Sequence, residues 1–423
     1  MSDEARFPGE VWVLLSATFL VTLGFGVMAP VVPALATSFG VGITAASFIV
    51  SAFSIVRLLF APMGGRLVSK FAERRVLLAG LALNGVATAA CGWAGSYTQL
   101  LVFRSIAGIG SVMFTVAGIG LILRLSPAGL RGRAAGMWST SALLGNMAGP
   151  LLGGLIAGSS LRLPFIAYGG STLLAALIVW LLLRHSVHTA PSAVRDLPEF
   201  TVRQAVRTKA YRAALASSFA NGWVTLGVRF ALIPLFVVYH LGGTSVTAGI
   251  TLTVYAVGTA STLLLSGRIA DRKGRRPVAL AGLTVLTMGV LALGLAESMQ
   301  FLVGAALIAG IGSGMINPAQ TATVADVIGT QVRGGPVLAT FQMAADLGAI
   351  VGPVVAGALA DMWSYQAAFS ATAVISVLAL AVWLRAPETL VGGAVSAPPT
   401  KVSQRQAEPG SEVCGPAADT SSS

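Results

Sequence analysis

The sequence predicts an all-α integral membrane protein with twelve transmembrane helices in two pseudo-symmetric six-helix bundles. Three observations support this fold class. The chain of 423 residues is 55% hydrophobic and only 10% charged, whereas about 25% of the residues of an average soluble domain are charged. Its apolar residues gather in runs of about 20, the length that a membrane-spanning helix needs. Short motifs also recur at a constant separation, which indicates two related halves.

The first half contains six apolar runs, each long enough to cross a bilayer as a helix. We expect these helices near residues 11–36, 45–67, 76–95, 98–123, 134–158 and 164–183. The first run follows a partly acidic start and has no cleavage-like site, so we expect a retained helix rather than a signal peptide. The first bundle is therefore expected over residues 1–184.

The second half follows a basic, polar segment at residues 185–209, which we expect to be a cytoplasmic linker. This segment is either a short amphipathic helix on the inner leaflet or a plain solvated linker. The second bundle is expected over residues 210–386, with helices near residues 212–239, 246–267, 277–296, 300–325, 336–360 and 364–385. Residues 387–423 are rich in Pro, Ser, Ala and Gly, and we expect a disordered cytoplasmic tail there.

Basic residues occur in alternate gaps between the runs. The gaps after the second, fourth, sixth, eighth and tenth runs are rich in Arg and Lys, whereas the opposite gaps hold only Arg162. Because Lys and Arg are retained on the cytoplasmic side, we expect both termini in the cytoplasm and a multi-pass protein of the plasma (inner) membrane. The net charge of +12 thus reflects membrane topology, and we expect no nucleic acid as a partner.

An internal repeat relates the two halves. Most matched segments are 202 residues apart (309 − 107), with a slip of one residue at the last of them. The matched segments are Ala107-Gly-Ile-Gly-Ser111 with Ala309-Gly-Ile-Gly-Ser313, Gly65-Arg66 with Gly267-Arg268, and Gly149-Pro150 with Gly352-Pro353. Repeated halves are typical of transporters, which hold the substrate near the membrane mid-plane between them.

The segment after the eighth run carries a spaced glycine and acid motif. Its residues are Gly267, Asp271, Arg272, Gly274 and Arg275. Through this motif the chain resembles the major facilitator superfamily, a resemblance that extends over residues 10–386. We expect Gly267 to allow close helix approach and Gly274 to form a tight turn. We expect Asp271 to accept hydrogen bonds from a helix N-terminus while an arginine pairs with it. Such a loop can latch the two halves together; the alternative is a generic basic turn.

The corresponding segment of the first half departs from this motif. Ser69 stands where the family has the acid, and Ala72 where it has the second glycine. We therefore do not expect a symmetric pair of latches. Glu73 is a candidate for the missing negative charge.

The fifth run carries a glycine motif that resembles the one in the exporting antiporters of this family. Its residues are Gly145, Gly149, Pro150, Gly153 and Gly154. Closely spaced glycines form a smooth face for another helix, and a proline removes one backbone hydrogen bond, so we expect a pivot here. An ordinary packing face is the alternative. The proline pair Pro30 and Pro33 is similar to a pattern in the twelve-helix drug-proton antiporter branch.

Four charged side chains lie well inside the apolar runs, where each is costly unless it is paired or hydrated. They are Arg57, Arg104, Arg229 and Asp346. Arg104 resembles the family's arginine linked to proton coupling. Asp346 is the one carboxylate placed to bind a proton within the bilayer, with Arg229 or Arg104 as the group that stabilises its charged form. The alternative for Asp346 is a fixed structural salt bridge.

The family architecture implies a substrate cavity between the halves. Its expected lining residues are Arg57, Asn146, Asn221, Trp223, Tyr255, Asn317 and Gln320. Apolar walls with a few polar groups suit an amphiphilic organic molecule.

We therefore predict a proton-coupled exporter of a drug-like or amphiphilic molecule that works by alternating access. The first alternative is a proton-coupled importer, and the second is a polytopic enzyme or sensor. The three histidines are scattered, and no Gly-rich phosphate loop is present, so we expect neither an enzyme nor a cofactor or metal site. The expected partners are the substrate, protons and the lipid bilayer, and the resemblance implies a monomer.

Overall fold

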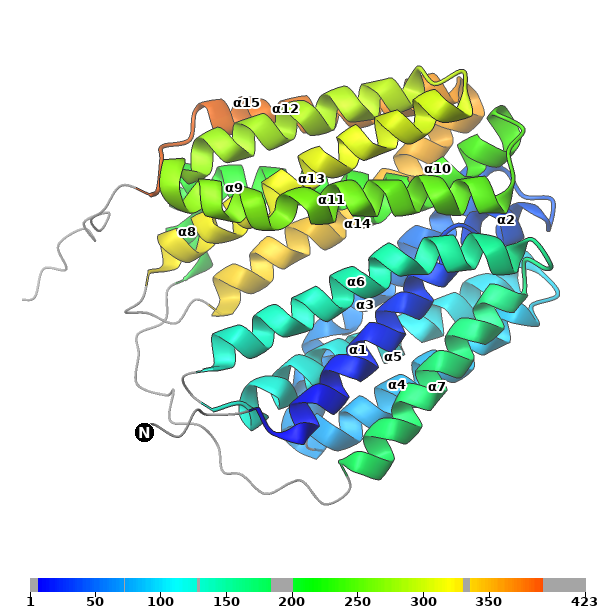
Figure 1. Ribbon diagram of the computed structural model, residues 1–423, viewed down its shortest axis with the longest axis horizontal. Coiled ribbons are helices and arrows are strands. Elements are labelled where there is room, and N and C mark those ends of the chain that lie inside the picture. The colour runs from blue at the N-terminus through cyan, green and yellow to red at the C-terminus, as the bar shows by residue number, and fades with distance from the viewer. Residues whose placement is uncertain (1–6, 72, 128–129, 184–200, 330–334, 391–423) are drawn as a thin grey trace, which may run out of the picture. The chain divides into compact units, whose positions relative to one another are not determined.

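The computed structural model describes residues 7–71, 73–127, 130–183, 201–329 and 335–390. Within these residues every regular element is a helix (Figure 1). Twelve helical segments of this part are long and apolar enough to cross a membrane. The predicted fold class and the predicted number of spans are therefore confirmed.

The first half is a bundle of six spans and one short helix. Its elements are α1 (Gly9–Met28), α2 (Val32–Thr37), α3 (Ile43–Phe71), α4 (Glu73–Gly92), α5 (Tyr97–Leu125), α6 (Arg131–Ala157) and α7 (Leu163–Leu182). The run expected at 11–36 is divided, since α1 ends at Met28 and α2 begins at Val32. Pro30 and Pro33 explain this division, because proline has no N–H to donate to a continuing helix.

The second half contains six more spans. Its elements are α8 (Val202–Arg207), α9 (Lys209–Asn221), η2 (Gly222–Val228), α10 (Arg229–Leu235), η3 (Phe236–His240), α11 (Ser245–Lys273), α12 (Arg275–Gly294), α13 (Met299–Ile328), α14 (Gly335–Met362) and α15 (Tyr365–Leu384). The elements α9 to η3 form one continuous span that contains two π-helical segments. The sequence did not predict these segments, which often mark functional sites in helices.

Serine caps define the start of several spans. The Ser96, Ser298 and Ser364 hydroxyls accept hydrogen bonds from backbone N–H groups of Gln99, Phe301 and Ala367 at 3.3, 3.4 and 3.1 Å. A serine in this position satisfies an N–H that the helix itself leaves without an acceptor. These caps explain how adjacent spans begin and end within very short polar connections.

The repeated glycines allow the same helix contact in both halves. α4 packs against α5, and α12 packs against α13. A Cβ atom on Gly110 would lie 2.5 Å from the Asn84 backbone nitrogen, and one on Gly312 would lie 2.3 Å from that of Leu286. Small residues of this kind bring membrane helices close enough for dispersion contact along their backbones. The repeat is therefore a packing feature that the two bundles share.

The two halves contact each other along α6 with α11 and along α3 with α14 (Figure 1). At one end of these helices, which we call the closed end, the Asp361 carboxylate of α14 accepts hydrogen bonds from the Ile43 and Thr44 backbone N–H groups at 3.0 and 2.7 Å. The Thr37 and Tyr239 hydroxyls lie 2.6 Å apart at the same end. Polar bonds therefore join the halves there.

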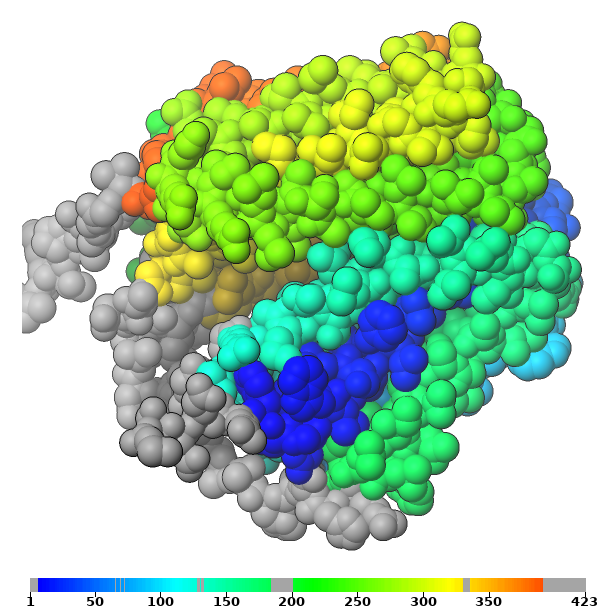
Figure 2. Space-filling model, in the orientation of Figure 1, coloured from blue at the N-terminus to red at the C-terminus, as the bar shows by residue number. Residues whose placement is uncertain are grey.

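The closed end also has close glycine contacts. A Cβ atom on Gly154 would lie 2.6 Å from the Ser245 carbonyl oxygen, and one on Gly357 would lie 2.8 Å from the Ser47 hydroxyl. Figure 2 shows the surface hollowed between α6 and α11 toward the start of α6, with α14 visible inside the hollow. The halves are thus joined at one end and separated at the other.

Two segments extend the second bundle beyond its expected limits. α8 begins with a capping box formed by Thr201 and Gln204, and Ala205 packs in a small apolar cluster with Tyr211 and Val337. At the other limit the fold continues past residue 386 to Leu390, because Glu388 binds the start of α12. The remainder of the expected linker and of the expected tail lies outside the described residues.

Candidate functional site

Asp346 lies in the middle of α14 and faces α3 of the other half. The Gln342 side-chain amide lies 3.5 Å from one of its carboxylate oxygens. One turn away, the Ser51 hydroxyl of α3 donates to the Ile350 carbonyl of α14 at 2.7 Å, so the two helices cross here. The charge of Arg57 on α3 acts on Asp346 across this crossing.

The basic group that acts on Asp346 is therefore Arg57, where the sequence favoured Arg229 or Arg104. Among the described side chains, no ion pair within 4.0 Å joins Asp346 to any of these arginines. The physical reason is that Arg104 and Arg229 are enclosed by aromatic rings, whereas Arg57 lies on the helix that crosses α14. In this state Asp346 does not form a fixed salt bridge.

Arg57 is held by a residue of the internal repeat. Its guanidinium donates to the Ser111 hydroxyl at 2.5 Å, and its Cζ atom lies 5.7 Å from the centre of the Phe53 ring. Ser111 ends the repeated segment of the first half, and Ser313 ends its counterpart. Both serines take part in polar contacts of the site. The repeat could therefore have identified them from the sequence, where it served only as evidence for two related halves.

Arg104 is one of the most enclosed charged side chains of the described part, with 3% of its surface exposed. Its Cζ atom lies 4.1 Å from the centre of the Phe53 ring and 5.7 Å from that of Phe25. Its Nε and one terminal nitrogen have no hydrogen-bond partner among the described residues. The guanidinium lines a cavity of about 20 Å³ to which both halves contribute, Phe25 from the first and Phe230 from the second.

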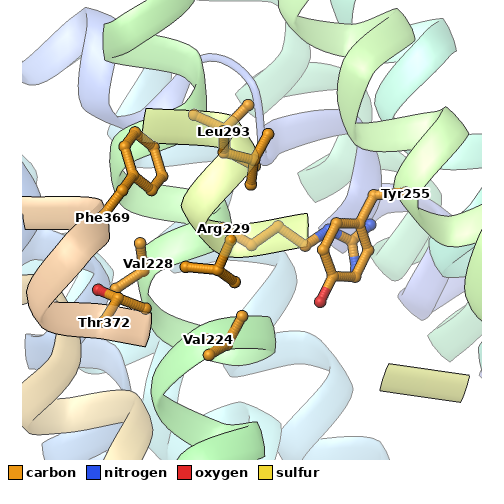
Figure 3. Close-up of a pocket in the computed structure, with 9 residues that line it drawn as sticks. Val224, Val228, Arg229, Tyr255, Leu293, Phe369 and Thr372 are labelled. Atoms are coloured by element: carbon orange, nitrogen blue, oxygen red, sulfur yellow. The ribbon is translucent and has the colours of Figure 1, made fainter. Parts of the chain in front are cut away.

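Arg229 has a related environment inside the second half. Its guanidinium lies 4.4 Å from the centre of the Tyr255 ring (Figure 3) and 4.8 Å from that of Phe230. One terminal nitrogen donates to the Leu252 carbonyl at 2.9 Å. Since 53 + 202 = 255, the rings under Arg104 and Arg229 occupy corresponding positions of the repeat. Each half thus holds one buried arginine against an aromatic ring of its second membrane span, which is α3 in the first half and α11 in the second.

Several expected cavity residues form one polar network in the second half. The Asn221 side-chain oxygen accepts hydrogen bonds from the Thr225 and Ser313 hydroxyls, each at 3.0 Å. The Thr225 hydroxyl also lies 3.1 Å from that of Tyr255. The Asn317 side-chain oxygen accepts hydrogen bonds from the amides of Asn221 and Gln320, each at 3.3 Å.

This network joins α9, η2, α11 and α13, and it brings together four of the residues expected to line a cavity, Asn221, Tyr255, Asn317 and Gln320. Ser313 of the internal repeat and Thr225, which the sequence did not single out, connect them. Threonine and serine are common in membrane helices as backbone-bonded residues, so their type alone gave no signal.

Two expected cavity residues lie elsewhere. The Trp223 indole donates to the Thr372 hydroxyl of α15 at 3.2 Å and packs inside the second half. The Asn146 side-chain oxygen, on α6, is buried without a hydrogen-bond partner among the described residues. Neither residue joins the polar network.

The expected latch segment belongs mostly to a helix. α11 continues to Lys273, so Gly267, Asp271 and Arg272 lie on its last turns. A Cβ atom on Gly267 would meet Pro318 at an ordinary 3.7 Å, so this position does not require glycine. Gly274 does, because its φ of +110° lies in a region that L side chains rarely adopt.

The acid and arginine of the latch form an ion-pair network within the second half. Arg275 donates to Asp271, and its Nε lies 3.2 Å from Asp326 of α13. The start of α12 is capped by Glu388 rather than by Asp271, since its carboxylate accepts the Arg275 and Arg276 backbone N–H groups at 2.8 and 3.0 Å. Among the described residues, these contacts all lie in the second half, so in this state they do not latch the halves together.

The first half has an equivalent ion pair with its charges reversed. The Glu73 carboxylate lies 2.6 Å from the Arg124 guanidinium. Since 73 + 202 = 275 and 124 + 202 = 326, this pair corresponds to Arg275 and Asp326. Glu73 therefore places a negative charge at the position that corresponds to Arg275, not at that of Asp271, and the charge of its partner on the neighbouring helix is reversed as well.

The glycine motif of α6 uses two faces. Cβ atoms on Gly145, Gly149 and Gly153 would lie 2.2, 2.5 and 1.8 Å from atoms of α1 in the same half. Gly154 instead meets α11 of the other half, and a Cβ on Gly249 of α11 would lie 2.4 Å from the Pro150 carbonyl oxygen. The motif therefore places α6 in close contact with both halves at once.

Comparisons with known proteins identify relatives of this chain. The model of the Major Facilitator Superfamily matches residues 14–232 and 214–408. Multidrug resistance protein 1 of Bacillus subtilis (strain 168) is 26% identical over 386 residues, which cover 89% of this chain and 97% of that protein. Quinolone resistance protein NorA of Staphylococcus aureus is 27% identical over 188 residues, which cover 44% of this chain and 48% of that protein.

Solved structures share the fold at lower sequence identity. A bacterial homolog to the human lysosomal transporter Spinster, in an inward-facing and unoccupied conformation, has a TM-score of 0.76 and 17% identity and covers 91% of this chain and 97% of its own. The human organic anion transporter MFSD10 (TETRAN) has a TM-score of 0.65 and 18% identity and covers 89% of this chain and 100% of its own.

Proposed function

The chain belongs to the Major Facilitator Superfamily, and from this premise we propose that it exports a drug-like, amphiphilic small molecule in exchange for protons. The chain is a multi-pass membrane transporter, because its family and its structural neighbours are transporters rather than enzymes. Coupling to protons, the outward direction of transport and the residues that bind the proton are proposed.

The position of Asp346 is the main support for proton coupling. The other described carboxylates lie at or near helix ends or in connections; they are Glu10, Glu73, Asp271, Glu297, Asp326, Asp361 and Glu388. Asp346 alone lies at depth, half-buried, on the interface between the halves. An ionisable residue in such a place is costly and serves transport in many membrane proteins.

Arg57 provides the link between protonation and conformation. Asp346 and Arg57 belong to different halves, so their attraction contributes to how the halves are held. A proton on Asp346 removes this attraction, and the balance between the two arrangements of the halves shifts. Alternating access follows from rocking of the repeated halves about the site between them.

The relatives and the packing of α6 support export. Two matched proteins are named for multidrug and quinolone resistance. The glycines of α6 also place this helix against both halves, as expected for a pivot. By the distribution of basic residues, we propose that the hollow end and both termini face the cytoplasm and that the monomer is the working unit.

The test uses purified protein in liposomes that contain the pH dye pyranine. Addition of dansylglycine or its methyl ester outside should raise the internal pH, because protons leave as the probe enters. Asp346→Asn should abolish this proton movement while probe exchange without a gradient remains. The control Glu297→Gln, which removes an exposed acid in a connection, should behave as the wild type.

Two outcomes would contradict the proposal. Full proton movement in Asp346→Asn would remove Asp346 from the coupling step. A fall of internal pH on addition of the probe would show that proton and probe move together, as in a proton-coupled importer.

A further inference from the structure

Arg104 has an unsatisfied charge at the interface between the halves. It is buried to 97%, with 3% of its surface exposed, and two of its three nitrogens lack a partner among the described residues. A buried charge without a counter-ion is costly, and a guanidinium forms its strongest hydrogen bonds with ionised acceptors, of which a carboxylate is the one common in small organic amphiphiles. The side chain lines the cavity between the halves, so an anion that enters from this cavity can reach it.

The charge balance of the interior favours an anion over a cation. The described charges at depth are Arg57, Arg104 and Arg229 against Asp346, which gives 3 − 1 = +2. Arg57 and Asp346 attract each other across the crossing of α3 and α14, although no ion pair within 4.0 Å joins them among the described side chains. Arg104 and Arg229 therefore remain without an acidic partner, and Arg229 at least donates to a backbone carbonyl.

The walls around Arg104 suit an aromatic ring. Phe25 of α1 lies edge-on to Phe230 of α10, with 5.6 Å between ring centres, and its ring is 5.8 Å from that of Phe53. Phe25, Phe230, Met28 and Val50 line the cavity as an apolar enclosure, and Arg104 is its one charged lining residue. The present volume of about 20 Å³ holds about one water molecule, so a larger group needs the halves to separate.

We infer that Arg104 is the carboxylate subsite of the substrate, so that the transported molecule is an amphiphile carrying a carboxylate next to an aromatic ring. The inference rests on the proposed function and names the substrate class for the same site. It assigns to Arg104 a contact with the substrate instead of the proton-coupling role that the family resemblance implies. The proton-binding role remains with Asp346, on a different helix.

Three dansyl probes that share one fluorophore test this inference. Dansylglycine is an anion, dansylglycine methyl ester is neutral, and dansylcadaverine is a cation. Binding is measured by fluorescence with the full-length protein in nanodiscs of zwitterionic lipid, where the surface charge of the bilayer does not sort the probes. The wild type should bind dansylglycine at least tenfold more tightly than its ester, and dansylcadaverine most weakly.

Two variants locate the charge preference. Arg104→Gln should bind dansylglycine and its ester equally, whereas Arg104→Lys should keep part of the preference because it keeps the charge. The matched control Arg203→Gln removes an exposed arginine of α8 and should bind as the wild type. If Arg104→Gln does not fold, the order of binding affinity for the three probes, measured in the wild type and in Arg104→Lys, still decides whether Arg104 binds a carboxylate.

The outcomes separate this inference from the proposed function. Equal binding of dansylglycine and its ester by the wild type, or an unchanged preference in Arg104→Gln, overturns the carboxylate subsite even where proton-coupled transport is observed. Conversely, a charge preference that depends on Arg104, without proton movement in liposomes, supports the subsite and overturns the coupling mechanism.

Discussion

At the scale of the residue, Glu388 shows how one carboxylate fixes a helix start and a chain end together. It accepts hydrogen bonds from the backbone N–H groups of Arg275 and Arg276 and from those of Thr389 and Leu390. Burial of the Glu388 carboxylate opposes its ionisation, but these hydrogen bonds hold its pKa below the ordinary glutamate value. The negative charge also lies at the N-terminus of α12, where the helix dipole favours it.

The Glu388 contacts predict a pH-dependent stability. Because its pKa is lower in the folded state, the contribution is fully present above the unfolded pKa and is lost as the pH falls through the folded pKa. Glu388→Gln should therefore lower the melting temperature at neutral pH, and the difference from the wild type should shrink at acidic pH. Thermal unfolding of both proteins in one detergent, from neutral to acidic pH, measures the difference in melting temperature. A difference that grows toward acidic pH would contradict a stabilising role for the ionised Glu388 carboxylate.

At the scale of the element, α6 is constrained along two faces by its glycines. One face meets α1 of its own half, and the other meets α11 of the second half. Gly153 is the most restricted of these positions, since a Cβ atom there would lie 1.8 Å from the Val27 carbonyl oxygen. A backbone atom cannot rotate away as a side chain can, so the whole helix has to move to admit a methyl group.

Gly153→Ala should therefore destabilise the protein by about 1–3 kcal/mol, the usual cost of an overpacked contact. The matched control is Gly136→Ala in the same helix, where no atom lies within 4 Å of the new Cβ. Alanine is the better helix former, so this variant should be neutral or more stable by up to about 1 kcal/mol. Thermal unfolding of both variants measures the difference, and equal melting temperatures would show that α6 is not held by close contact.

At the scale of the whole described molecule, the two halves are joined by polar contacts at the closed end. Asp361 accepts two backbone N–H groups at the start of α3 and a third hydrogen bond from the Thr44 hydroxyl at 2.5 Å. The acid and the helix that it caps come from different halves. This contact therefore has to break whenever the halves separate at the closed end.

Asp361→Asn should favour the state in which this end is open. An amide loses the charge that interacts with the helix N-terminus, an effect of about 0.3–1 kcal/mol. The measurement is the distance distribution between spin labels at Ser159 and Leu241, one near the closed end of each half, and long distances should become more populated. Glu297→Gln is the control. An unchanged distance distribution in Asp361→Asn would show that this carboxylate does not hold the closed end together.

The sequence by itself determined the parts of this protein that depend on local composition. Apolar length defined the twelve spans because a helix of about 20 apolar residues crosses the bilayer with all its backbone hydrogen bonds satisfied within the segment. The repeat at an offset of 202 defined the two halves. The Gly274 turn was predictable because a positive φ selects glycine locally, and Asp346 was found because a carboxylate is conspicuous in an apolar run.

Only the tertiary structure decided which of the buried groups meet. The sequence could not show that the charge of Arg57 acts on Asp346, because their proximity depends on how α3 crosses α14 from the other half. The capping of α12 by Glu388 and the ion pair between Glu73 and Arg124 were likewise not predictable, since the partners lie in different elements. Residue type and spacing report on the local helix, whereas pairing across helices is set by packing, and the contacts of the proposed site are of the second kind.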